Sequence, residues 1–213
     1  MKKIIITGGL GYIGMELSKL YSGISRNNNV TVIDKDFHAS RVSQLRRWGI
    51  YFDQVNILDK KKLINHLSDA DLIYHLAGIT NVPTTIQDVS KFSKKEINSV
   101  GVTGTKNILN LSSESIKIVF PSSHVIFEGT QKVFHNIDED FIPNPKLEYA
   151  KGKYLSELDI INSQKNYVIL RLGSVYGLSY DSMRLNIMPN LFSKITALNG
   201  EIKLFNGGKQ LKS

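Results

Sequence analysis

The sequence contains no cysteine, and this absence excludes several kinds of chemistry. Without thiols the chain has no disulfides, no thiolate metal ligands and no cysteine nucleophile. Long apolar runs are also missing, since no stretch approaches the roughly 20 residues that span a bilayer. Lys2 and Lys3 precede three isoleucines, but this apolar run stops at Gly8 and is too short for a signal peptide. We therefore expect a cytoplasmic protein with no metal and no membrane contact.

Positive charge is in excess, with a formal net charge of +8. The content of 41% hydrophobic and 22% charged residues is typical of a globular protein. The lysines occur in short clusters at 60–62 and 94–95. These clusters lack the interleaved aromatic residues and module signatures of nucleic-acid recognition. The composition therefore predicts a basic surface that favours small anionic ligands, and no nucleic-acid partner.

Apolar β-branched segments alternate with segments of helical period along most of the chain. The pattern predicts strands at 2–7, 30–34, 50–55, 72–76, 116–121 and 167–172. It predicts helices at 12–25, at 59–69, in a region ending near 113 after a loop with Pro83, and at 146–163. The strands are apolar throughout, as buried parallel strands are. This order predicts an α/β fold with a doubly wound parallel sheet of the Rossmann type.

The pattern changes after Gly177. Residues 183–198 predict a helix interrupted at Pro189, and residues 202–205 predict a short strand. We therefore divide the chain into a Rossmann domain at 1–177 and the beginning of a smaller region at 178–213.

Four glycines lie within the seven residues that follow the first predicted strand. Gly8, Gly11 and Gly14 have the spacing G-x-x-G-x-x-G, which allows a tight turn, close approach of a pyrophosphate and close helix packing. The helix that follows offers free N–H groups to phosphates. Asp34 ends the second strand, where it can bind both adenosine ribose hydroxyls and repel a 2′-phosphate. This favours NAD over NADP, although Lys35 and Arg41 offer positive charge nearby.

A phenol and an ammonium lie four residues apart in the stretch YAKGK. On a helix, Tyr149 and Lys153 share a face, and the ammonium is expected to lower the phenol pKa from about 10 so that it can act as a base. The pattern alone also arises by chance in lysine-rich helices. Ser122 and Ser123 come at the end of the fifth predicted strand, where an α/β sheet places its ligand crevice, and a serine hydroxyl there can hold a substrate oxygen.

Six ordered motifs together resemble the extended short-chain dehydrogenase/reductase family. They are TGGLGYIG, Asp34, HLAG, VFPSSHVIF, YAKGK and LRLGSVYG. The resemblance implies a Rossmann fold, NAD as cofactor and a nucleotide-sugar substrate. It implies Ser123, Tyr149 and Lys153 as the catalytic residues, with Lys153 also binding the nicotinamide ribose. It further implies cofactor contacts from Gly8, Gly11, Tyr12, Ile13, Gly14, Asp34, Lys35, Asn56, Ile57, Leu76, Ala77 and Gly78.

Some positions depart from the family pattern. Asn56 stands where an aspartate is usual, but its amide can still accept a hydrogen bond, so adenine binding is expected to be kept. Gly101 and Ser174 each replace an asparagine. Members that dehydrate a sugar carry an Asp-Glu pair after the catalytic hydroxyl, whereas this chain has His124 and Val125. Valine cannot transfer protons, which favours an epimerase over such a dehydratase, and His124 is expected to be structural or to face solvent.

The region after Gly177 resembles the family's nucleotide-holding segment. Ser123, Ser174, Asn186 and Lys212 are the implied substrate contacts. The family's chains continue past this point, so either this chain is truncated or its substrate-binding region is minimal.

The implied function is an NAD-dependent nucleotide-sugar epimerase that oxidises the sugar transiently at its 4-position with Tyr149 as base. A dehydratase, a dehydrogenase or reductase, and a non-catalytic NAD(H)-binding regulatory protein remain open. The resemblance also implies a homodimer.

Overall fold

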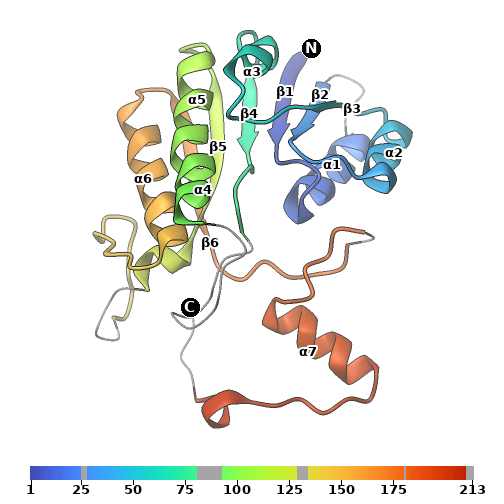
Figure 1. Cartoon of the computed structure of the whole chain (residues 1–213), viewed down its shortest axis with the longest axis vertical. Helices are drawn as coiled ribbons and strands as arrows, with labels where there is room; N and C mark the ends of the chain where they lie inside the picture. Colours follow the sequence, from blue (N-terminus) through green and yellow to red (C-terminus); the bar gives the residue numbers. More distant parts are fainter. Residues whose placement is uncertain (25–27, 81–92, 129–133, 180, 210–213) are drawn as a thin grey trace.

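A computed structural model describes residues 1–24, 28–80, 93–128, 134–179 and 181–209. Six parallel strands form one sheet in the order β3-β2-β1-β4-β5-β6 (Figure 1). In chain order the elements are β1 (Lys2–Thr7), α1 (Tyr12–Ile24), β2 (Asn28–Asp34), α2 (Ala39–Arg47), β3 (Tyr51–Gln54), α3 (Lys60–Leu67), β4 (Leu72–His75), α4 (Lys94–Asn98), the π-helical turn η1 (Ser99–Thr103), α5 (Gly104–Leu111), β5 (Lys117–Ser123), the 3-10 turn η2 (His124–Phe127), α6 (Glu148–Asn162), β6 (Asn166–Leu172), α7 (Met188–Ala197) and the 3-10 turn η3 (Phe205–Gly208).

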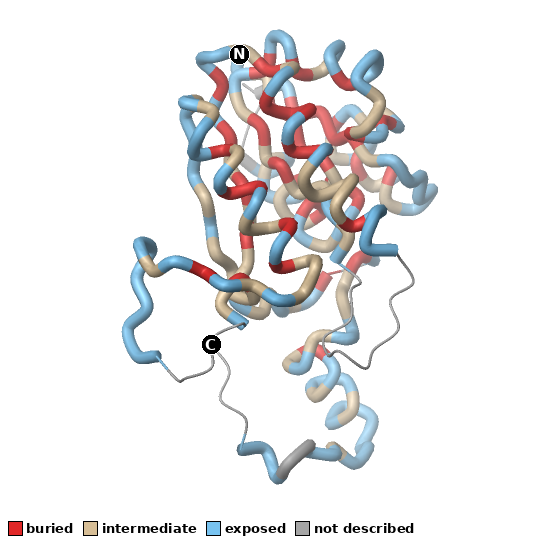
Figure 2. Tube along the Cα trace, turned by 60° about the vertical axis from the view of Figure 1, so that its left-hand side comes forward, coloured by how far each residue is buried: buried red, intermediate tan, exposed pale blue. Residues whose placement is uncertain are grey.

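The sheet carries helices on both faces, and each face has its own apolar core. Ile5, Ile33, Ile73 and Ile118 pack against α3, α5 and α6, whereas Ile4, Ile6 and Val32 pack against α1 and α2. The central strand β1 therefore buries consecutive isoleucines, and Figure 2 shows buried residues concentrated in the sheet and its flanking helices. The predicted doubly wound α/β fold is confirmed.

The strand order reverses between β1 and β4, because β2 lies on one side of β1 and β4 on the other. At such a switch point the carboxyl ends of neighbouring strands diverge into connections on opposite faces, which leaves a crevice at the sheet edge. The glycine loop, residues 8–14, leaves β1 at this point. The crevice is therefore the expected ligand site.

The region after Gly177 lies beyond the carboxyl edge of the sheet (Figure 1). Among its described residues, the buried ones are all polar: Ser179, Ser182 and Asn190. The described residues after Gly177 add no side chain to either apolar core.

Two predictions in the C-terminal region are wrong. The helix there begins at Met188, not at residue 183, and Pro189 lies in its first turn, where the missing N–H breaks no helical bond. The predicted strand at 202–205 is absent, since residues 201–204 form no regular element and Phe205 begins η3. The loop containing Pro83 lies outside the described residues.

Helix α2 has no counterpart in the sequence prediction, which placed no element between residues 34 and 50. Its sequence, ASRVSQLRR, is mostly polar, and its buried residues are Val42 and Leu45. Two apolar residues three apart give a weak periodic signal, although they suffice to dock the helix on the core beside β2. This helix carries Arg41.

Candidate active site

Two glycines of the glycine loop occupy positions that exclude any side chain. Gly8 has a φ of 64°, and a Cβ there would lie 2.6 Å from the Cα of Ala77. A Cβ on Gly14 would lie 2.5 Å from the Cα of Gly9. The loop is therefore packed against both the chain after β4 and the start of α1, as the predicted roles of these glycines require.

The start of α1 fits an anionic group. Met15 donates its N–H to the carbonyl of Gly11 at 3.0 Å, so the N–H groups of Tyr12 and Ile13 precede the helical hydrogen bonds. The first turn of α1 contains no acidic residue. Free N–H groups and a positive dipole end are the features that bind a pyrophosphate.

Asp34 lies at the carboxyl end of β2, beside the glycine loop. Its carboxylate accepts hydrogen bonds from the N–H of Leu10 at 3.1 Å and of Asp36 at 3.2 Å. Burial raises the pKa of this carboxyl, while these two hydrogen bonds lower it. The adjacent Lys35 is exposed and pairs with Asp36 at 3.8 Å.

The remaining cofactor candidates line the same edge. Leu76 and Ala77 donate their N–H groups to the carbonyl and hydroxyl oxygens of Thr7, which ties the chain after β4 to the end of β1. The side-chain oxygen of Asn56 accepts the N–H of Leu58 at 3.0 Å, which leaves a second lone pair on that oxygen and the NH₂ group for a ligand.

The three predicted catalytic residues come together at the carboxyl end of β5. Lys153 donates to the carbonyl of Pro121 at 2.7 Å, and its ammonium lies 4.4 Å from the centroid of the Phe120 ring and 6.0 Å from that of Tyr149. Ser123 ends the strand, and its hydroxyl is close enough to Tyr149 to act on the phenol pKa. A pocket with about 320 Å³ of empty volume, open solvent included, is lined by Ala77, Gly78, Gly101, Tyr149, Lys153 and Ser156.

The electrostatics of this set differ from the sequence prediction. Burial raises the pKa of Tyr149, although Arg184 and then Ser123 act in the opposite direction. Burial also lowers the pKa of Lys153 to about 8, against the charge of Glu157. The predicted lowering of the Tyr149 pKa is therefore wrong, because the loss of hydration outweighs the nearby positive charge.

A buried polar chain lies behind Lys153 and was missed by sequence reasoning, although His75 lies in the HLAG motif. His75 contacts Thr7 through Nδ1 at 2.9 Å and Thr105 through Nε2 at 3.0 Å. Thr105 donates to the carbonyl of Gly101 at 2.6 Å, so Nε2 carries the imidazole proton and Nδ1 accepts from Thr7. Burial, then the charge of Lys153, lowers the pKa of His75 to about 3. This neutral imidazole joins β1 and β4 to α5.

The substrate candidates are only partly gathered. Asn186 is exposed and its side-chain oxygen accepts from Arg184 at 3.2 Å, Ser174 is half-buried, and Lys212 lies outside the described residues. His124 contacts the carbonyl of Leu172 through Nδ1 at 3.1 Å, which agrees with the predicted structural role. Sequence reasoning missed Arg184, because nothing in the local sequence indicates that it approaches Tyr149.

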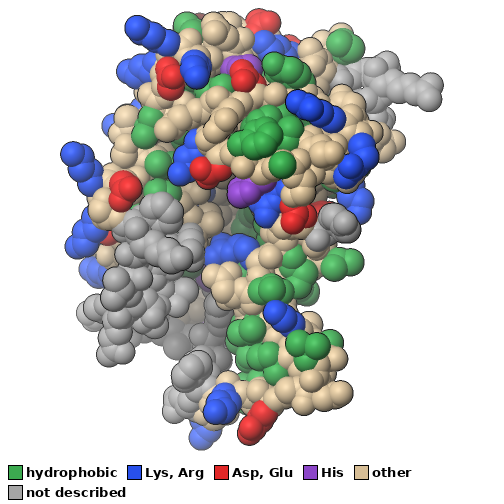
Figure 3. Space-filling model, turned by 45° about the vertical axis from the view of Figure 1, so that its right-hand side comes forward, with side chains coloured by type: hydrophobic (Ala, Val, Ile, Leu, Met, Phe, Trp, Pro, Cys, Tyr) green, Lys and Arg blue, Asp and Glu red, His purple; other side chains and the backbone are tan. Residues whose placement is uncertain are grey.

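Figure 3 shows one face of the molecule, on which Lys and Arg side chains are interspersed with Asp and Glu. Positive charge on that face is dispersed. Within the described ranges, no group of three or more His, Asp or Glu side chains could hold a metal ion. The same ranges contain no helix that is both long enough and apolar enough to cross a membrane.

The fold and the site together define an NAD-binding protein of the extended short-chain dehydrogenase/reductase class. Residues 4–213 match the NAD dependent epimerase/dehydratase family, and the chain belongs to this family. Members are NAD-dependent, and the glycine loop and Asp34 described above fit that cofactor.

Relatives and solved structures agree with this assignment. A UDP-glucose 4-epimerase of Mycoplasma genitalium is 30% identical over 210 residues, which cover 89% of this chain and 58% of the relative. A UDP-N-acetyl-alpha-D-glucosaminuronate decarboxylase of Bacillus cytotoxicus is 26% identical over 99% of this chain and 66% of its own length. The chain thus spans 58% and 66% of these two relatives.

Among solved structures, a UDP-glucose 4-epimerase of Thermotoga maritima bound to UDP-glucose superposes with a TM-score of 0.79, at 20% identity over 97% of this chain and 67% of that one. A UDP-glucuronic acid 4-epimerase of Bacillus cereus, crystallised with NAD and a fluorinated UDP-glucuronic acid, gives 0.77 at 24% identity over 97% and 66%. At these identities the likeness establishes the fold.

Proposed function

We propose that this chain is the NAD-binding and proton-transferring part of a nucleotide-sugar 4-epimerase. The observation that carries the proposal is the convergence of Ser123, Tyr149 and Lys153 at the sheet edge that also holds the glycine loop. The relatives' names add a UDP-sugar as the substrate class.

Tyr149 is the proton-transfer residue in this proposal. As phenolate, its oxygen accepts the proton of the sugar 4-hydroxyl and later returns it, while Ser123 holds the sugar oxygen in line. Because burial keeps the phenol protonated, this step depends on the positive charges of Arg184 and Lys153 close to the ring. Bound NAD supplies a reversible hydride acceptor, which inversion of an alcohol carbon requires.

The positions after Ser123 favour epimerisation over dehydration. His124 is held by the carbonyl of Leu172, and Val125 donates its backbone N–H to Ser123. The Val125 side chain cannot transfer a proton, and the His124 ring is tied to the backbone through Nδ1. The Tyr149, Ser123 and Lys153 set is sufficient for proton transfer at one hydroxyl.

The test is incubation with UDP- and dTDP-sugars, with the products resolved by NMR. Tyr149→Phe should reduce turnover about 10²- to 10⁴-fold or more, because it removes the hydroxyl that moves the proton. Tyr154→Phe, on the same helix, is the matched control and should keep full turnover. NAD affinity should change less than about twofold in both variants, since neither alters the glycine loop.

Three outcomes would contradict the proposal. Undiminished turnover in Tyr149→Phe would remove the proposed base. Stoichiometric release of NADH would indicate a dehydrogenase or reductase instead. Absence of any heat on titrating nucleotide sugars into the NAD-bound protein would indicate a non-catalytic NAD(H)-binding protein.

The assembly state stays a prediction. Helix α6 buries one face against the sheet and exposes Leu155, Leu158 and Ile161. This exposed apolar face supports the predicted homodimer through a helix that flanks the sheet.

A further inference from the structure

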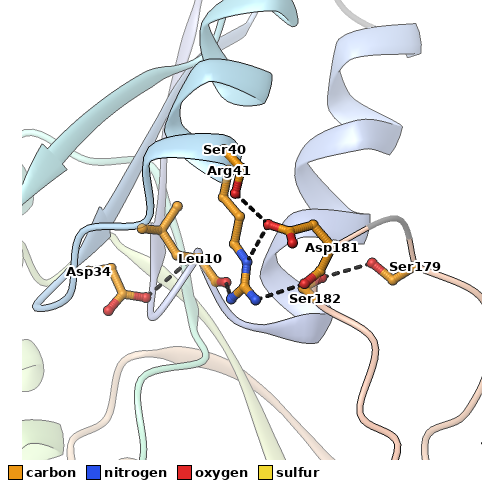
Figure 4. A network of polar contacts seen from close by, with 7 residues as sticks. All are labelled: Leu10, Asp34, Ser40, Arg41, Ser179, Asp181 and Ser182. Carbon is orange, nitrogen blue, oxygen red and sulfur yellow. Dashed lines mark hydrogen bonds and ion pairs between the residues drawn. The ribbon is translucent and has the colours of Figure 1, made fainter.

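Arg41 on α2 is held by a residue from the far end of the chain (Figure 4). Its Nε donates to the Asp181 carboxylate at 3.2 Å, and its Nη2 donates to the Asp181 carbonyl at 2.8 Å. Its Nη1 donates to the carbonyl of Leu10 at 2.7 Å. Ser40 donates to the same Asp181 carboxylate at 2.7 Å. All three nitrogens of the guanidinium therefore have partners.

Arg41 and Asp34 bind the same residue of the glycine loop from opposite sides. Leu10 donates its N–H to Asp34 and accepts from Arg41 through its carbonyl. Figure 4 shows Leu10 between the two side chains. The guanidinium therefore borders the place where the adenosine ribose of a dinucleotide meets Asp34.

This contact differs from an isolated surface ion pair. The Arg41 side chain is only 20% exposed, and two of its three hydrogen bonds go to backbone carbonyls. Hydrogen bonds from Ser40 and then Arg41 hold the pKa of Asp181 below its usual range, so its carboxylate stays charged. The two backbone carbonyls orient the guanidinium, and the Asp181 carboxylate is the partner that neutralises its charge.

A 2′-phosphate on the ribose needs a guanidinium or ammonium that can turn toward it, and an arginine fork is the strongest such receptor. Near Asp34, Arg41 faces Asp181 and Lys35 faces Asp36. Three carboxylates thus surround the arginine and the lysine at this place, with His38 also close to Asp34 and Asp181. Arg41 and Lys35, the two side chains of fixed positive charge that could receive a 2′-phosphate, are each already matched by a carboxylate.

We propose that Asp181 is a second specificity-determining residue for NAD, which acts by withdrawing Arg41 from a 2′-phosphate. Asp34 repels the phosphate directly, and Asp181 removes its receptor. The inference concerns the choice of cofactor and does not depend on the reaction that the protein catalyses.

The experiment is a double-mutant cycle on the full chain, with NAD and NADP affinities measured by titration calorimetry. Asp181→Asn alone should change NADP affinity little, because Asp34 still repels the phosphate. In the Asp34→Ser background, adding Asp181→Asn should tighten NADP binding by roughly tenfold or more, the gain expected when a guanidinium binds a phosphate. NAD affinity should differ less than about threefold between Asp34→Ser and the double variant, since NAD carries no 2′-phosphate.

Two further variants identify the source of the gain. Adding Arg41→Gln to the double variant should abolish the tighter NADP binding. Asp69→Asn is the matched control, since it removes one carboxylate from an ion pair with Lys3, near the start of β1. In the Asp34→Ser background it should leave NADP affinity unchanged within about twofold, because exposed charges that distant are screened.

Each remaining outcome overturns the proposal. A double variant that binds NADP no more tightly than Asp34→Ser would show that Asp181 does not withhold a receptor. A gain that survives Arg41→Gln would show that it acts by removal of negative charge alone. Loss of NAD binding in Asp181→Asn would assign the residue a structural role.

Discussion

The buried ammonium of Lys153 should make the stability of this protein rise with pH above neutrality. Burial lowers the Lys153 pKa from 10.5 to about 8. When the pKa of a lysine is lower in the folded state than in the unfolded state, the charged form of that lysine lowers the unfolding free energy. The full penalty applies below the folded pKa and disappears as pH rises through the interval between the two values.

The magnitude follows from the two pKa values. A shift from 10.5 to about 8 corresponds to roughly 3 kcal/mol of unfolding free energy at neutral pH. Proton linkage then predicts that the unfolding free energy rises by about 2 kcal/mol between about pH 7 and pH 9.5. The pKa of Tyr149 is raised from 10.0, so this group lowers the unfolding free energy as pH rises, but only above pH 10.0. The pH range of the measurement therefore ends below that pH.

The assay is chemical denaturation of the wild type and of Lys153→Met across this pH range. The variant removes the titrating group and keeps an apolar chain of similar length, so its curve should lack the gain of about 2 kcal/mol. Lys151→Met, on an exposed residue two positions away, should give a curve parallel to the wild type. Parallel curves for wild type and Lys153→Met would refute the argument, because the lysine would then be hydrated in the folded protein.

Two further substitutions test the packing around the site. Gly14→Ala should lower the unfolding free energy by about 1–3 kcal/mol and weaken NAD binding in calorimetry, because its Cβ would lie 2.5 Å from the Gly9 backbone. Gly23→Ala on the same helix is the control. It should be neutral or stabilising, because a Cβ there has nothing within 4 Å. Arg171→Met should lower the unfolding free energy by about 3–5 kcal/mol in denaturation, because it leaves the Glu157 carboxylate, 1% exposed, without its ion-pair partner. Adding Glu157→Gln should recover part of this loss. An Arg171→Met variant as stable as the wild type would contradict the reasoning.

The parts of the site that local sequence encodes could be predicted. The glycine spacing, the aspartate ending β2 and the Tyr149–Lys153 pair each depend on neighbours within one strand–turn–helix unit. Such units impose the same backbone geometry wherever they occur, as the 64° φ of Gly8 illustrates. For this reason the sheet was predicted correctly, and Tyr149 and Lys153 lie on a helix beside the end of the strand that carries Ser123.

The parts that depend on tertiary packing could not be predicted. The direction of the Tyr149 pKa required knowing how deeply α6 buries the phenol, which the spacing of Tyr149 and Lys153 does not reveal. The pairing of Arg41 with Asp181 joins residues 140 positions apart. Sequence reasoning treated Arg41 as available to a phosphate, because it could not know which carboxylate the fold brings to it.

Both of these long-range effects come from the stretch just after Gly177. Asp181 reaches back to α2 at the adenosine side of the crevice, while Arg184 donates to the carbonyl of Thr80 and lowers the pKa of Tyr149. This stretch buries no apolar side chain among its described residues, so its polar contacts to the Rossmann domain are what position it. It follows that both apolar cores lie before residue 177, whereas the polar contacts of the site cross that position. The pKa of Tyr149 responds to Arg184 from beyond that boundary, and the proposed selectivity for the cofactor joins Arg41 to Asp181 across it.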